Sequence, residues 1–157
     1  MKKLLFPLSI FLIFFFISCQ EKDTLTAEHK ASIADEVGKI YVEGISNLSK
    51  LNIEIWSEPW SKNNFLSVNS GVNYFSTYTE FKDSVEHWFS LRESQNVTIV
   101  DKKIYVLTSD QVLLTSIANW EILFKNEEEL KVKALATLLW KKEADGWKIV
   151  HLHESWQ

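Results

Sequence analysis

Two histidines and a serine occupy alternate positions near the end of the chain: His151, His153 and Ser155. Successive side chains of a β-strand point to opposite faces, so these three are predicted to share one strand face with Trp147 and Ile149. Imidazole, hydroxyl, indole and alkyl groups on a single face are typical of a cavity wall rather than of a dry core. We therefore expect this strand to line a pocket for a small apolar or aromatic ligand.

The two histidines allow more than one kind of chemistry. His153 is the best candidate for a proton carrier, because a histidine can titrate near neutral pH. The spacing of His151 and His153 also suits a metal ion, which would need a further ligand. The side chains considered for that role are His87, Glu86 and Glu121, and nothing in the sequence directs them there. Ser155 lacks the nucleophile elbow and the orienting acid of serine catalysis. No metal or other cofactor is expected.

The chain is rich in aromatic residues, and all seven Trp fall between Trp56 and Trp156. A Trp brings a large apolar area and an indole N–H that needs a partner when buried, so such a composition often accompanies a pocket or an interface. The alternative, that each Trp simply fills the core, stays open. The predicted apolar wall consists of Trp56, Trp60, Trp88 and Trp120, and the predicted polar anchors are His151, His153, Thr137 and Ser155.

Helical spacing comes first along the chain. Apolar residues recur at intervals of three and four from Ile33 to Leu51, which predicts a long helix with Thr26 as its N-cap. A short helical segment is predicted at 51–60 and ends at Pro59, because proline cannot continue a helix.

Two short β-type runs, 65–70 and 72–75, predict a small hairpin. Thr77 and Glu80 then have the spacing of a capping box, which predicts the start of a third helix. The residues expected on one face of that helix are Phe81, Val85, Trp88 and Arg92.

Four longer β segments complete the chain, at 97–107, 112–124, 130–142 and 147–156. Their connections are short and polar, so neighbouring strands are predicted to be antiparallel and to form a meander. Helices followed by a long antiparallel sheet predict an α+β domain in which the helices cover one face of a curved sheet.

The last turn predicts a register. If Ala144-Asp145-Gly146 is a three-residue loop with a left-handed glycine, Glu143 pairs with Trp147. Counting back from that pair places three residues opposite the candidate site: Leu139 opposite His151, Thr137 opposite His153 and Leu135 opposite Ser155. A two-residue loop would shift every partner by one.

The first 18 residues predict the cellular location. A basic start, Met1-Lys2-Lys3, precedes an apolar run of about 15 residues, which is too short to span a membrane and suits a signal peptide. Cys19, the only cysteine, follows Ser18 and resembles the lipidated cysteine of a bacterial lipoprotein; an ordinary secreted protein is the alternative. We expect a signal peptide at 1–18, a lipidated tether at 19–25 and one domain at 26–157, in the bacterial cell envelope.

Composition narrows the range of partners. The 17 basic and 21 acidic side chains are interspersed, without a basic block. Nucleic-acid binding needs a cationic surface, so no nucleic-acid partner is expected. Membrane attachment is expected through Cys19 only. With that single cysteine the domain has no intramolecular disulfide to stabilise it.

The element order and the closing run Gly-Trp-Lys-Ile-Val-His-x-His-x-Ser, 146–155, resemble the SnoaL-like branch of the nuclear transport factor 2-like superfamily. The resemblance implies a cone-shaped fold with a pocket at its wide end, lined by His153 and Ser155. It also implies that Leu135, where the family often has a basic residue, makes the pocket more apolar. The family includes isomerases, dehydratases and polyketide cyclases as well as domains without known activity.

Three functions remain open at this point. The first is a lipid-anchored domain that binds a small molecule or a partner without catalysis. The second is an isomerase or dehydratase of the ketosteroid isomerase type, for which the resemblance suggests Tyr41 as donor and Glu58 or Glu154 as base. The third is a homodimerisation module that pairs through its sheet.

The lipoprotein hypothesis predicts that Cys19→Ala releases the protein from the membrane fraction, because the substitution removes the lipid acceptor. Fractionation followed by immunoblotting measures this. Unchanged membrane association in the variant would contradict the hypothesis.

Overall fold

The computed structural model describes residues 25–157, in which three helices and six strands follow one another. The helices are α1 (Ala27–Leu48), α2 (Ile53–Ser57) and α3 (Tyr78–Leu91). The strands are β1 (Ser67–Ser70), β2 (Asn73–Phe75), β3 (Arg92–Val106), β4 (Gln111–Phe124), β5 (Glu129–Glu143) and β6 (Gly146–Trp156). The predicted signal peptide 1–18, Cys19 and all of the predicted tether except Leu25 lie outside the described residues. None of the described helices is long and apolar enough to cross a membrane.

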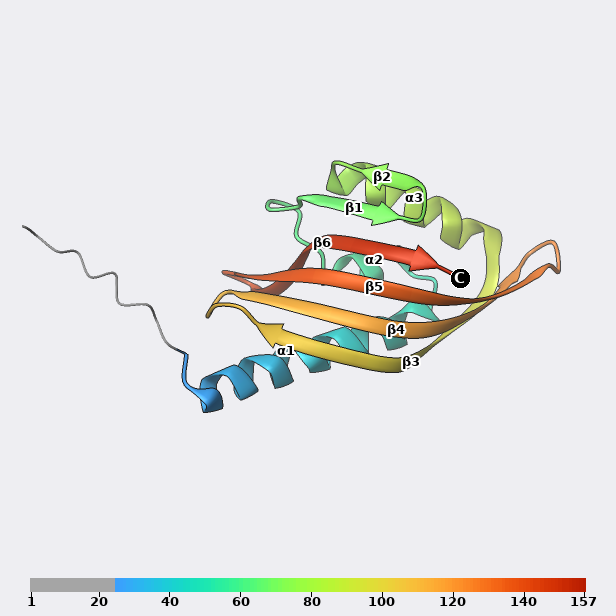
Figure 1. Cartoon of the computed structure of the whole chain (residues 1–157). Coiled ribbons are helices and arrows are strands. Elements are labelled where there is room, and N and C mark those ends of the chain that lie inside the picture. Colours follow the sequence, from blue (N-terminus) through green and yellow to red (C-terminus); the bar gives the residue numbers. More distant parts are fainter. Residues whose placement is uncertain (1–24) are drawn as a thin grey trace, which may run out of the picture.

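The six strands form one curved sheet in the order β2-β1-β6-β5-β4-β3 (Figure 1). The predicted meander β3–β6 is antiparallel throughout, and the hairpin β1–β2 joins it through a parallel pairing of β1 with β6. The helices lie behind the sheet in Figure 1, and no described helix covers the front. We call the helix side the inner face and the front the outer face. The predicted α+β fold is confirmed.

Side-chain caps fix where the long helices begin. The Thr26 hydroxyl accepts a hydrogen bond from the His29 N–H at 3.2 Å, and the Thr77 hydroxyl accepts one from the Glu80 N–H at the same distance. Both bonds satisfy amides that a helix leaves unpaired in its first turn. The two predicted N-caps are confirmed.

Helix α1 approaches the sheet closely at Gly38. A Cβ atom at this position would lie 3.1 Å from the Cδ1 atom of Ile104 in β3. Glycine therefore permits a contact that a larger residue would hinder. Ile33 and Val37, one helical turn apart, are buried in the same core cluster.

The orientation of α3 differs from the prediction. Its buried residues are Phe81 and Phe89, whereas Trp88 is 43% exposed. Apolar residues three and four positions apart could both share the buried face. The buried face of the helix contains Phe81, Val85 and Phe89, which are spaced four apart. Trp88 consequently lies at the outer flank of the helix.

Strand β6 contains an extra residue. Trp140 pairs with Ile149 and Leu139 pairs with His151, so Val150 has no partner in β5. The last turn has two residues, Ala144 and Asp145, instead of the three expected, and this shifts the register by one. The bulge at Val150 shifts it back. The predicted pairs at His151, His153 and Ser155 are therefore present. The prediction of a three-residue turn, from which they were derived, is wrong.

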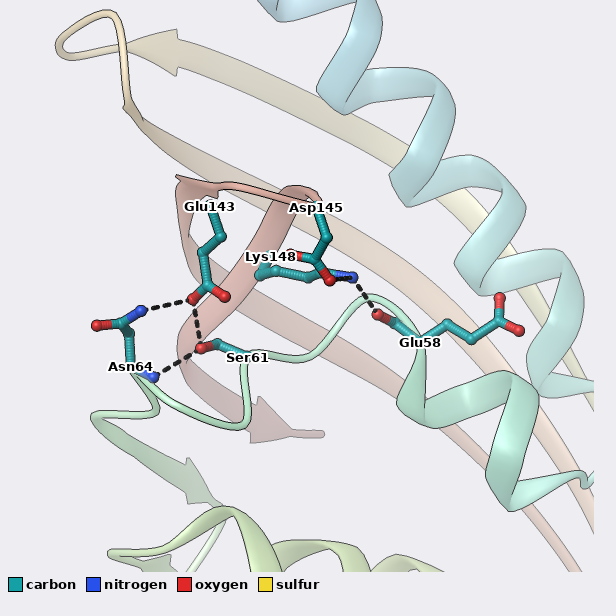
Figure 2. A network of polar contacts seen from close by, with 6 residues as sticks. All are labelled: Glu58, Ser61, Asn64, Glu143, Asp145 and Lys148. Carbon is teal, nitrogen blue, oxygen red and sulfur yellow. Dashed lines mark hydrogen bonds and ion pairs between the residues drawn. The ribbon is translucent and has the colours of Figure 1, made fainter.

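The segment that joins α2 to β1 is attached to the end of the β5–β6 hairpin by polar contacts (Figure 2). The Ser61 hydroxyl donates to the Glu143 Oε1 atom at 2.5 Å and accepts from the Asn64 N–H at 2.8 Å. The Asn64 side-chain amide donates to the same Glu143 atom at 2.8 Å. Lys148 donates to the Glu58 carbonyl at 3.0 Å. These contacts hold the chain on both sides of Trp60.

We expect Ser61→Ala to lower the free energy of unfolding by about 1–3 kcal/mol, because it leaves the Asn64 N–H and the Glu143 carboxylate without their shared hydroxyl. Ser61 is only 1% exposed, so water cannot readily replace the hydroxyl. Denaturant unfolding measures the change. Ser32→Ala, at an exposed position of α1, is the control and should stay within about 0.5 kcal/mol of wild type. Equal stability of both variants would show that the Ser61 contacts contribute nothing.

Candidate functional site

A cavity of about 150 Å³ lies between the helices and the inner face of the sheet. Its lining comes from all three helices and from β4, β5 and β6. Most of the wall is aromatic or aliphatic, with three polar side chains among them. The aromatic members are Tyr41, Trp56, Trp60, Phe81, Trp120 and Trp140, and the polar groups are the Tyr41, Ser116 and Glu154 side chains.

The aromatic rings form a continuous surface at the helical end of the cavity. The ring centroid of Trp60 lies 5.5 Å from that of Trp56 and 4.7 Å from that of Phe81. The Trp60–Phe81 contact has an edge-to-face geometry, which is a favoured arrangement for aromatic pairs. Of the four Trp predicted to form the wall, the structure places Trp56, Trp60 and Trp120 in it. Trp88 is not part of it.

The predicted polar anchors lie on the other side of the sheet. His153, Ser155, Thr137 and Leu135 border a shallow depression on the outer face, together with Asp101 and Lys103. The prediction that these residues line the cone cavity is wrong. The physical reason is the bulge at Val150: one inserted residue reverses the faces of all side chains beyond it.

His151 and His153 differ in their surroundings. His151 Nδ1 lies 3.0 Å from both the hydroxyl and the carbonyl oxygen of Ser67 in the neighbouring β1. His153, the predicted proton carrier, is exposed and borders the outer face instead of the cavity. No three potential metal ligands of the His, Cys, Asp or Glu type gather anywhere in residues 25–157. His87, Glu86 and Glu121 are all exposed.

The reversal brings Glu154 into the cavity instead. Its Oε1 atom accepts a hydrogen bond of 2.5 Å from the Ser70 hydroxyl in β1. The Trp156 indole N–H donates to the same Ser70 hydroxyl at 3.4 Å. Burial raises the pKa of Glu154 above its ordinary value, and this outweighs the opposing effects of Ser70, Trp156, Arg92 and His153. Glu58, the other carboxyl considered as a base, is exposed.

Two hydroxyl groups accompany the carboxyl. Tyr41 of α1 is 6% exposed, and burial raises the pKa of its hydroxyl, with Ser116 opposing and Glu154 adding to the rise. The Ser116 hydroxyl of β4 is buried near the Tyr41 hydroxyl, but no well-aligned hydrogen bond joins it to a partner among the described residues. A buried hydroxyl without a partner is costly. A ligand with one polar group could supply the missing partner.

Sequence reasoning missed Ser116 and Trp140 and gave Glu154 little weight. Alternation along β5 contained a signal for Trp140, since Ala134, Ala136, Leu138 and Trp140 share one face. No equivalent signal existed for Glu154, because its direction depends on the bulge. Alternation without a bulge assigns it to the face away from the cavity.

The model of the SnoaL-like domain family matches residues 37–157 of the chain. No curated protein matches the chain. Several solved structures match the chain. The sequence identity of those described below is low, so they are evidence for the fold alone.

One of these structures is a proposed dehydratase of the nuclear transport factor 2-like family from Streptomyces avermitilis, with a TM-score of 0.71 at 18% identity over 80% of this chain and 97% of that one. Another is a hexachlorocyclohexane dehydrochlorinase from Novosphingobium barchaimii, with a TM-score of 0.70 at 10% identity over 84% and 91%. A third is a nuclear transport factor 2-like superfamily protein from Salmonella enterica, with a TM-score of 0.68 at 12% identity over 82% and 90%.

The raised pKa of Glu154 predicts a pH-dependent stability. A carboxyl whose pKa is higher in the folded state binds its proton more tightly there, so wild-type stability should fall as the pH rises from the ordinary value of 4.5 through the raised one. Glu154→Gln removes this titration. The stability of the variant relative to wild type should therefore increase towards neutral pH, as measured by denaturant unfolding at several pH values.

Glu121→Gln, at an exposed carboxyl of β4, is the matched control and should follow the wild-type pH dependence. Parallel curves for wild type and Glu154→Gln would mean that the Glu154 carboxyl titrates normally in the folded protein.

Proposed function

The chain belongs to the SnoaL-like domain family within the nuclear transport factor 2-like superfamily, and from this premise we propose that it binds a small, largely apolar molecule in the cavity between helices and sheet. The observation that carries the proposal is a cavity with an aromatic wall and only three polar side chains. Such a division, with apolar walls and a few placed polar groups, is usual for ligand pockets.

The size of the cavity limits the ligand. An apolar cavity of about 150 Å³ can hold a molecule of about the size of benzene. A single-ring compound, or the ring of a larger molecule that extends out of the cavity, fits this description.

The polar anchors in this proposal are Glu154, Tyr41 and Ser116. They replace the histidine, serine and threonine set expected from the sequence, which lies on the outer face. Each can form a hydrogen bond with a polar group of a ligand. Within the described residues, the Ser116 hydroxyl forms no well-aligned hydrogen bond.

A second candidate is an acid–base enzyme of the isomerase or dehydratase type, with Glu154 as the proton carrier. The specific observation in its favour is a carboxyl of raised pKa in the same cavity as the Tyr41 hydroxyl. Enzymes often tune a glutamate in this direction. Two structural neighbours are named as a dehydratase and as a dehydrochlorinase.

We also propose the cell envelope as the location, through lipidation of Cys19, and homodimerisation as a possible state. The outer face supports the second proposal, since Leu113, Ile117, Leu135 and Leu139 are only half-buried there. A second copy could cover them, as sheet faces of this kind often pair.

We expect Ala136→Leu to abolish binding of toluene, because the added carbons occupy the cavity. Ala136→Val adds less volume and should lose less affinity. The measurement is the rise in melting temperature with toluene, combined with native mass spectrometry of gently purified protein to detect a retained molecule.

Thr137→Leu is the control, since the neighbouring side chain points to the outer face. It should bind toluene as wild type does. Undiminished binding to Ala136→Leu, with the variant folded, would contradict the proposed location of the site.

A further inference from the structure

We propose that the ligand of this cavity carries a basic amine beside its apolar ring, and that Glu154 binds the amine as an ammonium ion. The inference rests on the proposed binding function and names the chemical class of the ligand. It follows from the charge and the hydrogen-bonding capacity of the cavity lining and from its aromatic residues.

The charge of the lining favours a cation. Glu154 is the only charged side chain among the residues that line the cavity in the described part of the chain. An anionic ligand would meet this carboxyl with no basic side chain in the described cavity lining to compensate it. Burying a charge is costly unless it is paired, and an ammonium ion would supply the pair.

The carboxyl keeps capacity for a ligand. Ser70 occupies one position on Oε1 at 2.5 Å, while an ionised carboxylate can accept about four hydrogen bonds. An ammonium group has three donors to offer. The Tyr41 and Ser116 hydroxyls line the same cavity and can accept from the same group.

Arg92 does not take the place of the ligand. It exerts an attractive charge effect on Glu154, but its guanidinium is hydrogen-bonded to Gln95 and it does not line the cavity. No ion pair within 4.0 Å joins Arg92 to Glu154 among the described residues. The remaining titratable group that acts on the carboxyl, His153, lies on the outer face.

The Trp156 and Trp120 rings are connected to the Glu154 carboxyl through Ser70. Trp156 bonds to Ser70, which in turn bonds to Glu154, and the Trp156 ring centroid lies 5.1 Å from that of Trp120 in the cavity wall. A cation near the face of a Trp ring is attracted to it. Trp120, which lines the cavity, is thus connected to the carboxyl through Trp156 and Ser70.

The alternative is a ligand with a carbonyl group, which would accept a hydrogen bond from the protonated Glu154 carboxyl. This requires the neutral carboxyl and is favoured at acidic pH, whereas ammonium binding requires the ionised carboxyl and strengthens as the pH rises. Because burial raises the pKa of Glu154, this change should occur at a higher pH than the titration of an ordinary carboxyl. The pH dependence of binding thus distinguishes the two ligand classes.

The experiment compares benzylamine, benzyl alcohol and benzaldehyde, which share a ring and differ in the polar group. Calorimetry on the purified full-length protein measures each affinity from acidic to mildly alkaline pH. We expect benzylamine to bind about tenfold or more tightly than benzyl alcohol near neutral pH, since hydrogen bonds to charged groups are the stronger ones. Its affinity should fall as the pH falls, while that of benzyl alcohol stays constant.

Glu154→Gln keeps the shape of the side chain and should remove the preference for benzylamine without removing the binding of benzyl alcohol. Glu43→Gln, at an exposed carboxyl on α1, should keep the preference. Equal affinity for the amine and the alcohol, or a preference for benzaldehyde that grows at acidic pH, would overturn the amine inference and leave the pocket in place. Failure of all three compounds to bind would overturn both proposals.

Discussion

The unpaired residue Val150 in β6 determines which side chains of the last strand reach the cavity. Its carbonyl accepts a hydrogen bond of 2.7 Å from the Leu66 N–H, and the preceding Ile149 N–H donates to the Pro59 carbonyl at 2.7 Å. The segment between α2 and β1 therefore satisfies main-chain groups that an irregular strand would otherwise leave unpaired. Because this segment is itself attached through Ser61 and Asn64 to Glu143, the bulge and the wall around Trp60 depend on each other.

Beyond the bulge, an ionisable group lies in an apolar enclosure. Burial of Glu154 disfavours its charged form, and the Ser70 hydrogen bond and the Arg92 charge compensate only in part, so the pKa is raised. The Ser116 hydroxyl is also buried without a well-aligned hydrogen bond among the described residues, which is costly. A molecule that bonds these groups would bind the folded chain alone and stabilise it in proportion to its concentration over its dissociation constant. Polar groups kept at such a cost are an argument for an occupant.

Most of the fold could be predicted from local patterns, because its causes are local. The N-caps at Thr26 and Thr77 and the meander of β3–β6 follow from side-chain bonds and short connections. The site could not be predicted in the same way. Strand alternation assigned His153 to the cavity, and a bulge whose hydrogen bonds come from Pro59 and Leu66, more than 80 residues earlier, reversed that assignment. Trp56 and Trp120 were less sensitive to this error, because α2 and β4, which carry them, contain no inserted residue.

The composition of the cavity also discriminates between the two enzymatic alternatives. A dehydratase needs a base for the carbon-bound proton and a separate acid for the departing hydroxyl group. Apart from Glu154, the one titratable side chain in the described lining is Tyr41. Because its pKa is raised, Tyr41 is a weak proton donor, but its neutral hydroxyl can donate a hydrogen bond. An isomerisation, in which one carboxyl removes a proton and returns it to another carbon, needs only the groups present. If the cavity catalyses a reaction at all, proton transfer by a single carboxyl matches its residues better than dehydration does.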